Sequence, residues 1–312
     1  MATVPTYVVI TPARNEIQFL ELTLKSVVSQ TILPLRWVIV SDGSTDGTDE
    51  LVQKYAADHP WIELVRMPER KERHFAGKVQ AFNAGYSRIQ GLDFQVLASL
   101  DADVSFDENY FSSLLQKLAA DSGLGLVGTP FKETSSQVYD YRFVNIEHVS
   151  GACQVFRREC FEQIGGYQPI EGGGIDYVAV LTARMKGWKT RTFTETVCLH
   201  HREMGTAQQH LLSARFKYGV KDYNFGNHPA WECFRIVYQM TKPPLAIGGI
   251  ALAAGYTWAS MIRRARPVSK ELVAFSRREQ MQRLKNFFAK KFSPKKHGLE
   301  PIEEDNAGSK IA

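Results

Sequence analysis

Two carboxylates, Asp101 and Asp103, lie one residue apart in the stretch LASLDADVSF, directly after a run of apolar residues. Carboxylate oxygens are the ligands that hard divalent cations such as Mg²⁺ and Mn²⁺ prefer. A D-x-D triplet is expected about once by chance in a chain of this length, and alone it is equally typical of a solvated loop after a strand. The surroundings of the triplet therefore have to decide between a metal site and a loop.

Two further stretches carry groups suited to chemistry. Asp176 follows the glycine run EGGG and precedes YVAVLTARMKGW, which has the pattern of a helix. A carboxylate at this point could act as a general base or could simply cap the helix, and the helix dipole favours its charge in either case. In CLHHREMG, His200 and His201 are candidate metal ligands or packing histidines, and His200 is the preferred ligand.

The elements that must position these residues alternate between strand and helix. Apolar runs predict strands at 6–11, 35–41, 61–67, 94–100 and 124–131. Apolar residues at helical spacing predict intervening helices at 16–30, 44–58, 77–90 and 107–121. The first of these helices is expected to begin its apolar face at Ile17. Alternation at these lengths predicts an α/β fold with a mostly parallel sheet flanked by helices.

Three polar clusters follow strands of this predicted sheet. TPARNE follows the first strand, SDGSTDGT the second, and DAD the fourth. Ligands of open parallel sheets bind at the carboxyl ends of the strands, so the three clusters should meet at one edge. The chain has neither G-x-G-x-x-G after the first strand nor G-x-x-x-x-G-K-[ST], which argues against a dinucleotide-binding domain and a P-loop.

The motifs TPARNE, VSDGSTDGT, GKVQAFNAG, LDADVSF and GGGIDYVAVLTARMKGW together resemble family-2 glycosyltransferases of the GT-A (Rossmann-like) fold. The resemblance covers roughly residues 4–205. It implies a nucleotide-diphosphate sugar as donor, a divalent Mg²⁺ or Mn²⁺ ion, and inversion at the transferred sugar. UDP is expected in preference to GDP because uridine is the commonest nucleotide in the family.

The resemblance also implies roles for particular residues. Asp103 would bind the metal directly, with Asp101 directly or through water and His200 completing the shell. Asp176 would be the catalytic base, with Glu171 as the alternative, although the family's usual acidic pair is reduced here because Ile175 precedes Asp176. The residues that would contact the nucleotide sugar are Pro12, Arg14, Glu16, Asp42, Lys78, Asp101, Ala102 and Gly151.

The C-terminal part has a different character. Residues 243–262 carry no charge, and residues 263–297 hold twelve Lys or Arg against two acids, within a chain of net charge +5. An uncharged stretch of this length can span a bilayer or lie on it, and a basic helix with Leu272, Phe275 and Phe288 suits an anionic membrane surface. Nucleic acid is not expected, because no recognition fold accompanies the charge.

These features predict four parts: a GT-A catalytic domain at 1–205, a helical extension at 206–242, a membrane-associated segment at 243–297 and a disordered tail at 298–312. The four cysteines lack C-x-x-C spacing and no signal peptide is evident, so free thiols and the cytoplasmic face of a membrane are expected.

The predicted reaction is transfer of one sugar to a hydroxyl of a glycan or lipid-linked acceptor, because Q-x-x-R-W, the motif of processive synthases, is absent. A polyprenyl-phosphate sugar synthase and a non-catalytic membrane scaffold are the alternatives.

Overall fold

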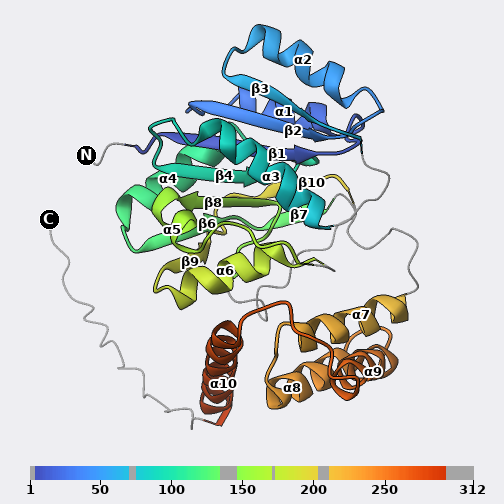
Figure 1. The fold of residues 1–312 in the computed structure, drawn as a ribbon. Helices are drawn as coiled ribbons and strands as arrows, with labels where there is room; N and C mark the ends of the chain where they lie inside the picture. The colour runs from blue at the N-terminus through green and yellow to red at the C-terminus, as the bar shows by residue number, and fades with distance from the viewer. Residues whose placement is uncertain (1–3, 70–74, 134–145, 171–172, 203–210, 293–312) are drawn as a thin grey trace, which may run out of the picture.

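The structure, a computed structural model, describes residues 4–69, 75–133, 146–170, 173–202 and 211–292 (Figure 1). Its centre is a seven-stranded sheet in the order β3-β2-β1-β4-β8-β6-β9. The strands are β1 Tyr7–Ala13, β2 Arg36–Asp42, β3 Ile62–Met67, β4 Val96–Leu100, β6 Leu124–Gly128, β8 Cys153–Arg157 and β9 Lys189–Thr192. β8 runs antiparallel to β4 and β6, and the other neighbouring pairs are parallel. The predicted α/β fold with a mostly parallel sheet is confirmed.

The central strands are apolar along their whole length because both faces of the sheet are covered. In β1, Val9 packs into the core on one face, whereas Val8 and Ile10 pack on the other. The first face carries α1 Leu20–Val28, α2 Thr48–Asp58 and α4 Tyr110–Ala120, and the second carries α3 Phe75–Ile89, α5 Arg158–Gln163 and α6 Ile175–Met185. The seven-stranded sheet and the helices on its two faces therefore form three layers, helix on sheet on helix (Figure 1).

A second sheet of three short strands lies beside the carboxyl end of β4. β10 (Cys198–His200) pairs antiparallel with β5 (Val104–Ser105) and parallel with β7 (Phe131–Glu133). The sequence did not predict this sheet, because strands of two or three residues have no readable periodicity. Its effect is to bring a segment near residue 200 against the turn that follows β4.

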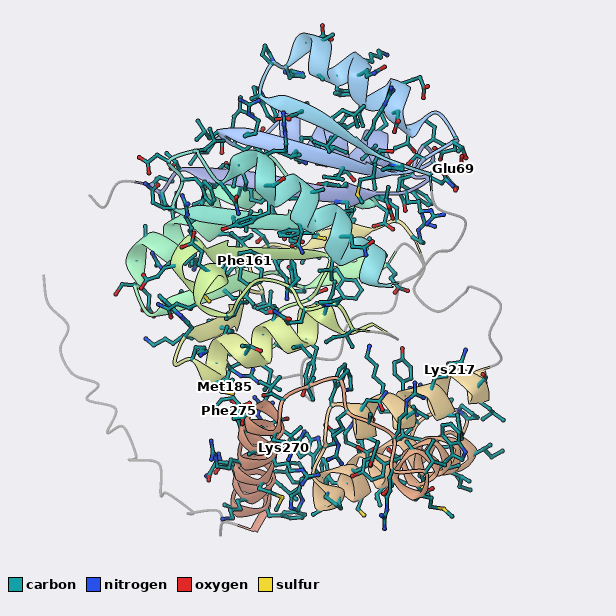
Figure 2. All side chains as sticks on the ribbon, in the orientation of Figure 1. Glu69, Phe161, Met185, Lys217, Lys270 and Phe275 are labelled. Atoms are coloured by element: carbon teal, nitrogen blue, oxygen red, sulfur yellow. The ribbon has the colours of Figure 1, made fainter. Side chains whose placement is uncertain are left out.

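The described residues from 211 to 292 form four helices: α7 Leu211–Asn224, α8 Pro229–Met240, α9 Ile247–Met261 and α10 Lys270–Phe292. They lie at one end of the molecule, beyond α6 (Figure 1). Leu272 and Val273 of α10 are buried. Phe275 of α10 and Met185 of α6 pack against the hydrophobic core on the second face of the main sheet (Figure 2). The predicted boundaries at 205, 242 and 297 stay predictions, and the tail at 298–312 lies outside the described residues.

Two predictions about elements need correction, and one question that the sequence left open can be addressed. The helix predicted over 16–30 begins only at Leu20, and Ile17 lies before it with 41% of its surface exposed. The backbone N–H groups of Glu16 and Ile17 donate to side chains of the next loop, Thr48 and Asp46, which ties this segment to that loop.

The question left open concerns the uncharged stretch at 243–262, which was expected to span a bilayer or to lie on it and is helical from Ile247 to Met261. In the part of the chain that the structure describes, no helix combines the length and apolar character that crossing a bilayer requires.

The second correction concerns α10, whose apolar residues from Leu272 to Phe288 were expected to suit a membrane surface. Leu272, Val273 and Ser276 instead face the protein interior, where they pack beside α6. The helical periodicity was right, but its apolar face is used for packing within the chain.

As predicted, all four cysteines are free thiols.

Candidate functional site

The carboxyl ends of β1, β2 and β4 open into a cleft of about 400 Å³. Ala13, Ala81 and Arg202 form part of its lining. The rest of the lining consists of nine predicted site residues: Pro12, Arg14, Glu16, Asp42, Lys78, Asp101, Ala102, Asp103 and His200. Because parallel strands end at the same edge, residues far apart in sequence meet here. The expected convergence of the polar clusters is therefore observed.

The first two polar loops are bound to each other along one wall of the cleft. The N–H of Asn15 donates to the Ser44 hydroxyl at 3.1 Å, and the N–H of Thr45 donates to the Asn15 side-chain oxygen at 2.9 Å. Asn15 has a positive φ of 54°, a conformation that asparagine tolerates better than most residues. The two loops thus form one continuous wall, and the side chains of Glu16 and Asp42 within it are buried.

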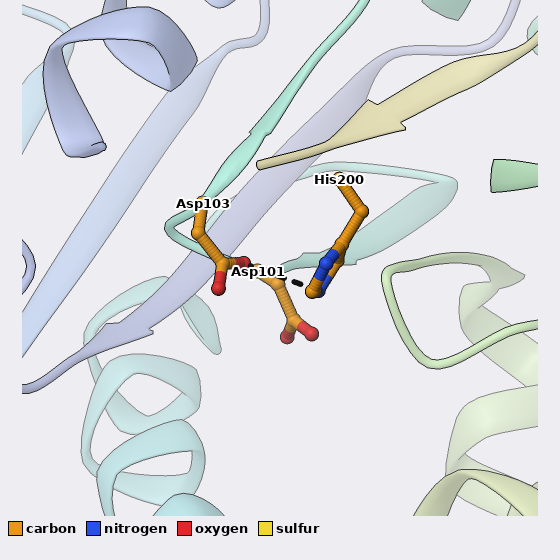
Figure 3. A group of neighbouring side chains, drawn as sticks. All are labelled: Asp101, Asp103 and His200. Carbon is orange, nitrogen blue, oxygen red and sulfur yellow. Dashed lines mark ion pairs between the residues drawn. The ribbon is translucent and has the colours of Figure 1, made fainter. Parts of the chain in front are cut away.

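Asp101, Asp103 and His200 form a compact group at the floor of the cleft (Figure 3). One ligand atom from each lies within 4.8 Å of the others. The dashed line in Figure 3 joins His200 Nε2 to a carboxylate oxygen of Asp103, 3.5 Å apart. Asp103 is 8% exposed and His200 7% exposed. Two carboxylates and an imidazole converging on one point form a donor set that suits a divalent cation.

Strand register explains why His200 and not His201 joins this group. β10 pairs His200 with Val104 and Leu199 with Ser105, and alternate residues of a strand face opposite sides. His200 consequently points inward, whereas Leu199 is 47% exposed. The next residue, His201, hydrogen-bonds through Nε2 to the Ser105 hydroxyl at 2.8 Å.

A backbone carbonyl orients the His200 ring. Nδ1 of His200 is hydrogen-bonded to the carbonyl oxygen of Arg202. Because a carbonyl oxygen only accepts, Nδ1 is the donor of this hydrogen bond, and Nε2 is the ring nitrogen on the side of Asp103. Metal-binding histidines in proteins are commonly held by this kind of outer hydrogen bond. The local structure therefore fits a divalent cation without rearrangement of the imidazole.

Two cations balance the carboxylates. Lys78 Nζ lies 2.5 Å from Asp101 Oδ1. Burial alone would lower the pKa of Lys78, but the charge of Asp101 and its hydrogen bond outweigh burial and raise the pKa. Burial raises the pKa of Asp101, and the charge of Lys78 opposes that rise. Desolvation and ion pairing thus act against each other at this pair.

Arg202 is the second cation, and the sequence analysis did not single it out. Its Nε lies 3.1 Å from Asp103 Oδ2, and its other end pairs with Glu16. Burial would lower the pKa of Arg202, but the charges of Glu16 and Asp103 raise it. A signal was present in CLHHREMG, because residues two apart in an extended segment face the same side and Arg202 follows His200 by two.

Asp176 lies in the first turn of α6, and neither it nor Gly151 is among the residues that line the cleft. A Cβ placed on Gly151 would come within 3.1 Å of Asp176 Oδ2, so this glycine is what allows the carboxylate its position. The neighbouring carbonyl of Ala152 accepts a 2.9 Å hydrogen bond from the N–H of Asp101. The Gly151 segment therefore joins Asp176 to the carboxylate turn.

The helix cap at this point is Gly174, not Asp176. Gly174 has φ 99°, and a Cβ there would lie 2.4 Å from the Phe225 ring. The capping role that the sequence left open for Asp176 is thus not observed. His148 lies on the same side as Asp176, and burial lowers the pKa of its imidazole while the charge of Asp176 opposes that effect. Glu171, the alternative base, lies outside the described residues.

The carboxylate pair and the histidine at the carboxyl edge of this α/β sheet agree with the GT-A type of fold that the sequence motifs implied. The sequence profile of glycosyl transferase family 2 matches residues 8–165, about half of the chain, and the chain belongs to that family.

Among curated relatives, a poly-beta-1,6-N-acetyl-D-glucosamine synthase of Staphylococcus aureus is 25% identical over 205 residues. The alignment covers 65% of this chain and 45% of the synthase, so the chain matches less than half of that relative's length.

Two solved structures share the fold. The mannosyltransferase PcManGT from Pyrobaculum calidifontis, in complex with GDP-Man and Mn²⁺, has a TM-score of 0.55 at 20% identity and covers 92% of this chain and 81% of its own. TarS of S. aureus in complex with UDP-GlcNAc has a TM-score of 0.53 at 13% identity and covers 91% and 81%. At these identities the likeness concerns the fold alone.

Proposed function

We propose that the protein transfers a single sugar from a nucleotide-diphosphate sugar to a hydroxyl group of a glycan or lipid-linked acceptor, with inversion at the sugar. The observation that carries this proposal is the grouping of Asp101, Asp103 and His200 in a cleft beside the segment that holds Gly151 next to Asp176. One carboxylate group is placed to hold a cation, and a separate carboxylate is placed beyond it. Leaving-group stabilisation and proton removal need this separation.

Asp103, Asp101 and His200 would hold the metal ion. The ion, when bound, neutralises negative charge that develops on the diphosphate as it leaves. The imidazole nitrogen in the donor set favours Mn²⁺ over Mg²⁺, because Mg²⁺ binds almost entirely through oxygen. Both solved neighbours bind nucleotide sugars and one contains Mn²⁺, which supports the same classes of ligand here.

The donor would lie along the carboxyl edge of the sheet. Pro12, Arg14, Glu16 and Asp42 form the wall for the nucleoside, and Lys78 would approach the nucleoside or the diphosphate. Ala102 and Gly151 would lie next to the transferred sugar, where small residues allow close backbone approach. UDP is preferred to GDP as the nucleotide on the family expectation.

Asp176 would remove the proton of the acceptor hydroxyl. A carboxylate in the first turn of a helix keeps its negative charge favourably, as a base must. Attack from the side of Asp176, opposite the departing diphosphate, would invert the sugar. Gln154 donates a 3.3 Å hydrogen bond to the carbonyl of Asp176, and Tyr167 donates to Gln154 at 2.7 Å. This chain of hydrogen bonds would fix the backbone of the base.

A thermal-shift titration tests the donor. UDP, GDP, CMP and dTDP are each added with and without Mn²⁺, since a ligand of the native state raises the melting temperature. We expect a Mn²⁺-dependent shift with one diphosphate and its loss in Asp103→Ala. A folded protein that shifts with no nucleotide would favour the non-catalytic scaffold.

Asp176→Asn tests the acceptor class. Transfer to a hydroxyl should fall by about 10²–10⁴-fold in this variant, because general-base catalysis is lost. Metal-dependent nucleotide binding should remain. Transfer that survives Asp176→Asn, with a polyprenyl phosphate as acceptor, would instead identify a polyprenyl-phosphate sugar synthase, because a phosphate needs no base.

A further inference from the structure

The outer face of α9 is an uncovered apolar stripe. Ile247, Ile250, Trp258 and Met261 recur at intervals of three, eight and three residues and are 53%, 56%, 44% and 83% exposed. Such spacing puts them on one side of a helix. Leu245 before the helix and Ile262 after it are 67% and 51% exposed. A surface helix of a soluble protein normally turns its large apolar residues inward, so this arrangement is reversed.

The inner face of α9 explains the reversal. Its buried residues are Gly248, Gly249, Leu252, Gly255 and Ala259. A Cβ on Gly255 would lie 2.0 Å from the carbonyl oxygen of Phe216 in α7, and one on Gly249 would lie 2.4 Å from Met240 in α8. α9 therefore packs backbone to backbone against its neighbours through small residues. Except for Leu252, the large aliphatic side chains of α9 face outward, because the close backbone approach leaves little room on the inner side.

The charges around the stripe are of one sign. No acidic residue occurs between Glu232 and Glu271, whereas this interval holds six basic residues. Arg263, Arg264 and Arg266 follow the end of α9 directly and are exposed, and Lys242 precedes its start. An apolar stripe with cationic residues at both ends matches the surface of an anionic bilayer, which offers acyl chains flanked by negative headgroups.

We infer that α9 lies in the plane of an anionic membrane surface, with Ile247, Ile250, Trp258 and Met261 inserted among the lipids and the flanking arginines on the headgroups. A helix of 15 residues is about 22 Å long, shorter than the hydrocarbon core of about 30 Å, and so lies on the bilayer. This surface serves binding only and does not depend on the proposed reaction.

Docking by α9 would orient the cleft. α7 is joined to α9 by the close packing at Gly255, and Phe225, just after α7, packs against Tyr177 beside Asp176, with ring centroids 5.2 Å apart. The first turn of α6, which carries Asp176, is thus connected by packed side chains to α7 and through it to α9. An acceptor anchored in the same membrane would reach the cleft from this side.

Vesicle co-sedimentation of the full chain tests the inference. The probes are vesicles of phosphatidylcholine alone and of phosphatidylcholine mixed with anionic phosphatidylglycerol, without nucleotide or metal. We expect binding to the anionic vesicles and its loss in the double variant Ile250→Glu, Met261→Glu. Arg263→Ala and Arg264→Ala should each weaken binding by about fivefold, and high salt should weaken it further.

A matched control comes from another part of the surface. Leu33 and Leu35 are 48% and 46% exposed in the loop before β2, and Leu33→Glu with Leu35→Glu should leave vesicle binding unchanged. Unchanged circular dichroism and melting temperature identify variants that fold. Trp258 emission should shift to the blue on vesicle binding, and Trp258→Phe should remove that shift.

Three results would overturn the inference. If the Ile250→Glu, Met261→Glu variant binds anionic vesicles as well as the wild type does, the apolar stripe is not the membrane-binding surface. If the wild-type chain does not bind anionic vesicles, the protein does not dock on an anionic membrane through α9. A dimer in solution that this double variant dissociates would show that a second copy covers α9. None of these outcomes bears on nucleotide binding, so the proposed reaction stands or fails separately.

Discussion

Replacing Arg202 with alanine should have opposite effects on metal and nucleotide binding. The guanidinium lies between Asp103 and Glu16, which are 8% and 7% exposed, so it neutralises the charge that a cation would otherwise meet. Its removal leaves a more negative site for Mn²⁺. A nucleoside diphosphate, in contrast, loses a positive partner in the same cleft.

The size of the effect follows from the geometry. Two unit charges about 4 Å apart at an effective dielectric of about 20 interact by about 4 kcal/mol. The Arg202 side chain is 41% exposed, so solvent screening reduces its worth to about 1–1.5 kcal/mol. That corresponds to about tenfold in a dissociation constant. We therefore expect Arg202→Ala to bind Mn²⁺ alone about tenfold more tightly and UDP with saturating Mn²⁺ about tenfold more weakly.

Calorimetric titration measures both affinities, and the electron paramagnetic resonance of free Mn²⁺ checks the first. Arg202→Lys, which keeps the charge, should resemble the wild type in metal affinity. Arg88→Ala serves as a control, because Arg88 makes a comparable 2.6 Å ion pair with Glu63 outside the cleft. If Arg202→Ala weakens Mn²⁺ binding, the guanidinium shapes the metal site and does not compete with the ion, and the reasoning fails.

Three further variants probe other features. Burial, reinforced by the charge of Asp222, raises the pKa of Glu232 to about 7. Between about pH 4.5 and pH 7 the folded state therefore holds a proton that the unfolded state has released, and the free energy of unfolding falls as the pH rises through this range. Glu232→Gln should remove that loss, about 3 kcal/mol by linkage, and raise the melting temperature more at pH 8 than at pH 5; an equal rise at both would contradict the assignment. Gly151→Ala should reduce transfer by about 10²-fold by displacing Asp176, yet keep UDP–Mn²⁺ binding in calorimetry. In Gly219→Ala a Cβ would lie 2.0 Å from the Leu252 carbonyl oxygen and should destabilise the fold by about 1–3 kcal/mol in urea, whereas Gly91→Ala, with open space around it, should not.

Five of the seven strands of the main sheet could be predicted from their apolar runs, whereas β8 and β9 were not predicted. The cleft could be predicted because parallel strands place their carboxyl ends together, which made three weak motifs into one site. Glu16 and Asp42, which the family resemblance implied, lie in this cleft. The preference for His200 over His201 could not be derived from the sequence pattern. That choice depends on the register of a three-residue strand.

The orientation of α9 could not be read from the sequence. Residues 243–262 are uncharged on every side, so apolar periodicity has no contrast with which to identify the buried face. The informative signal was size: Gly248, Gly249 and Gly255 mark the side of close helix packing. Arg202 was missed for a related reason, because its partners Glu16 and Asp103 are distant in sequence and only the fold brings them together.

The pairing of β10 with β5 has a consequence for how the protein is made. His200 joins a carboxylate turn that leaves the ribosome about a hundred residues earlier, and contacts between such distant segments form late in folding. The cleft wall built from the first two loops can assemble while the chain is still growing. His200, the third proposed ligand, arrives only when β10 adds to the small sheet. Tight metal binding should therefore mark completed folding, and an unfinished chain should hold the ion only loosely.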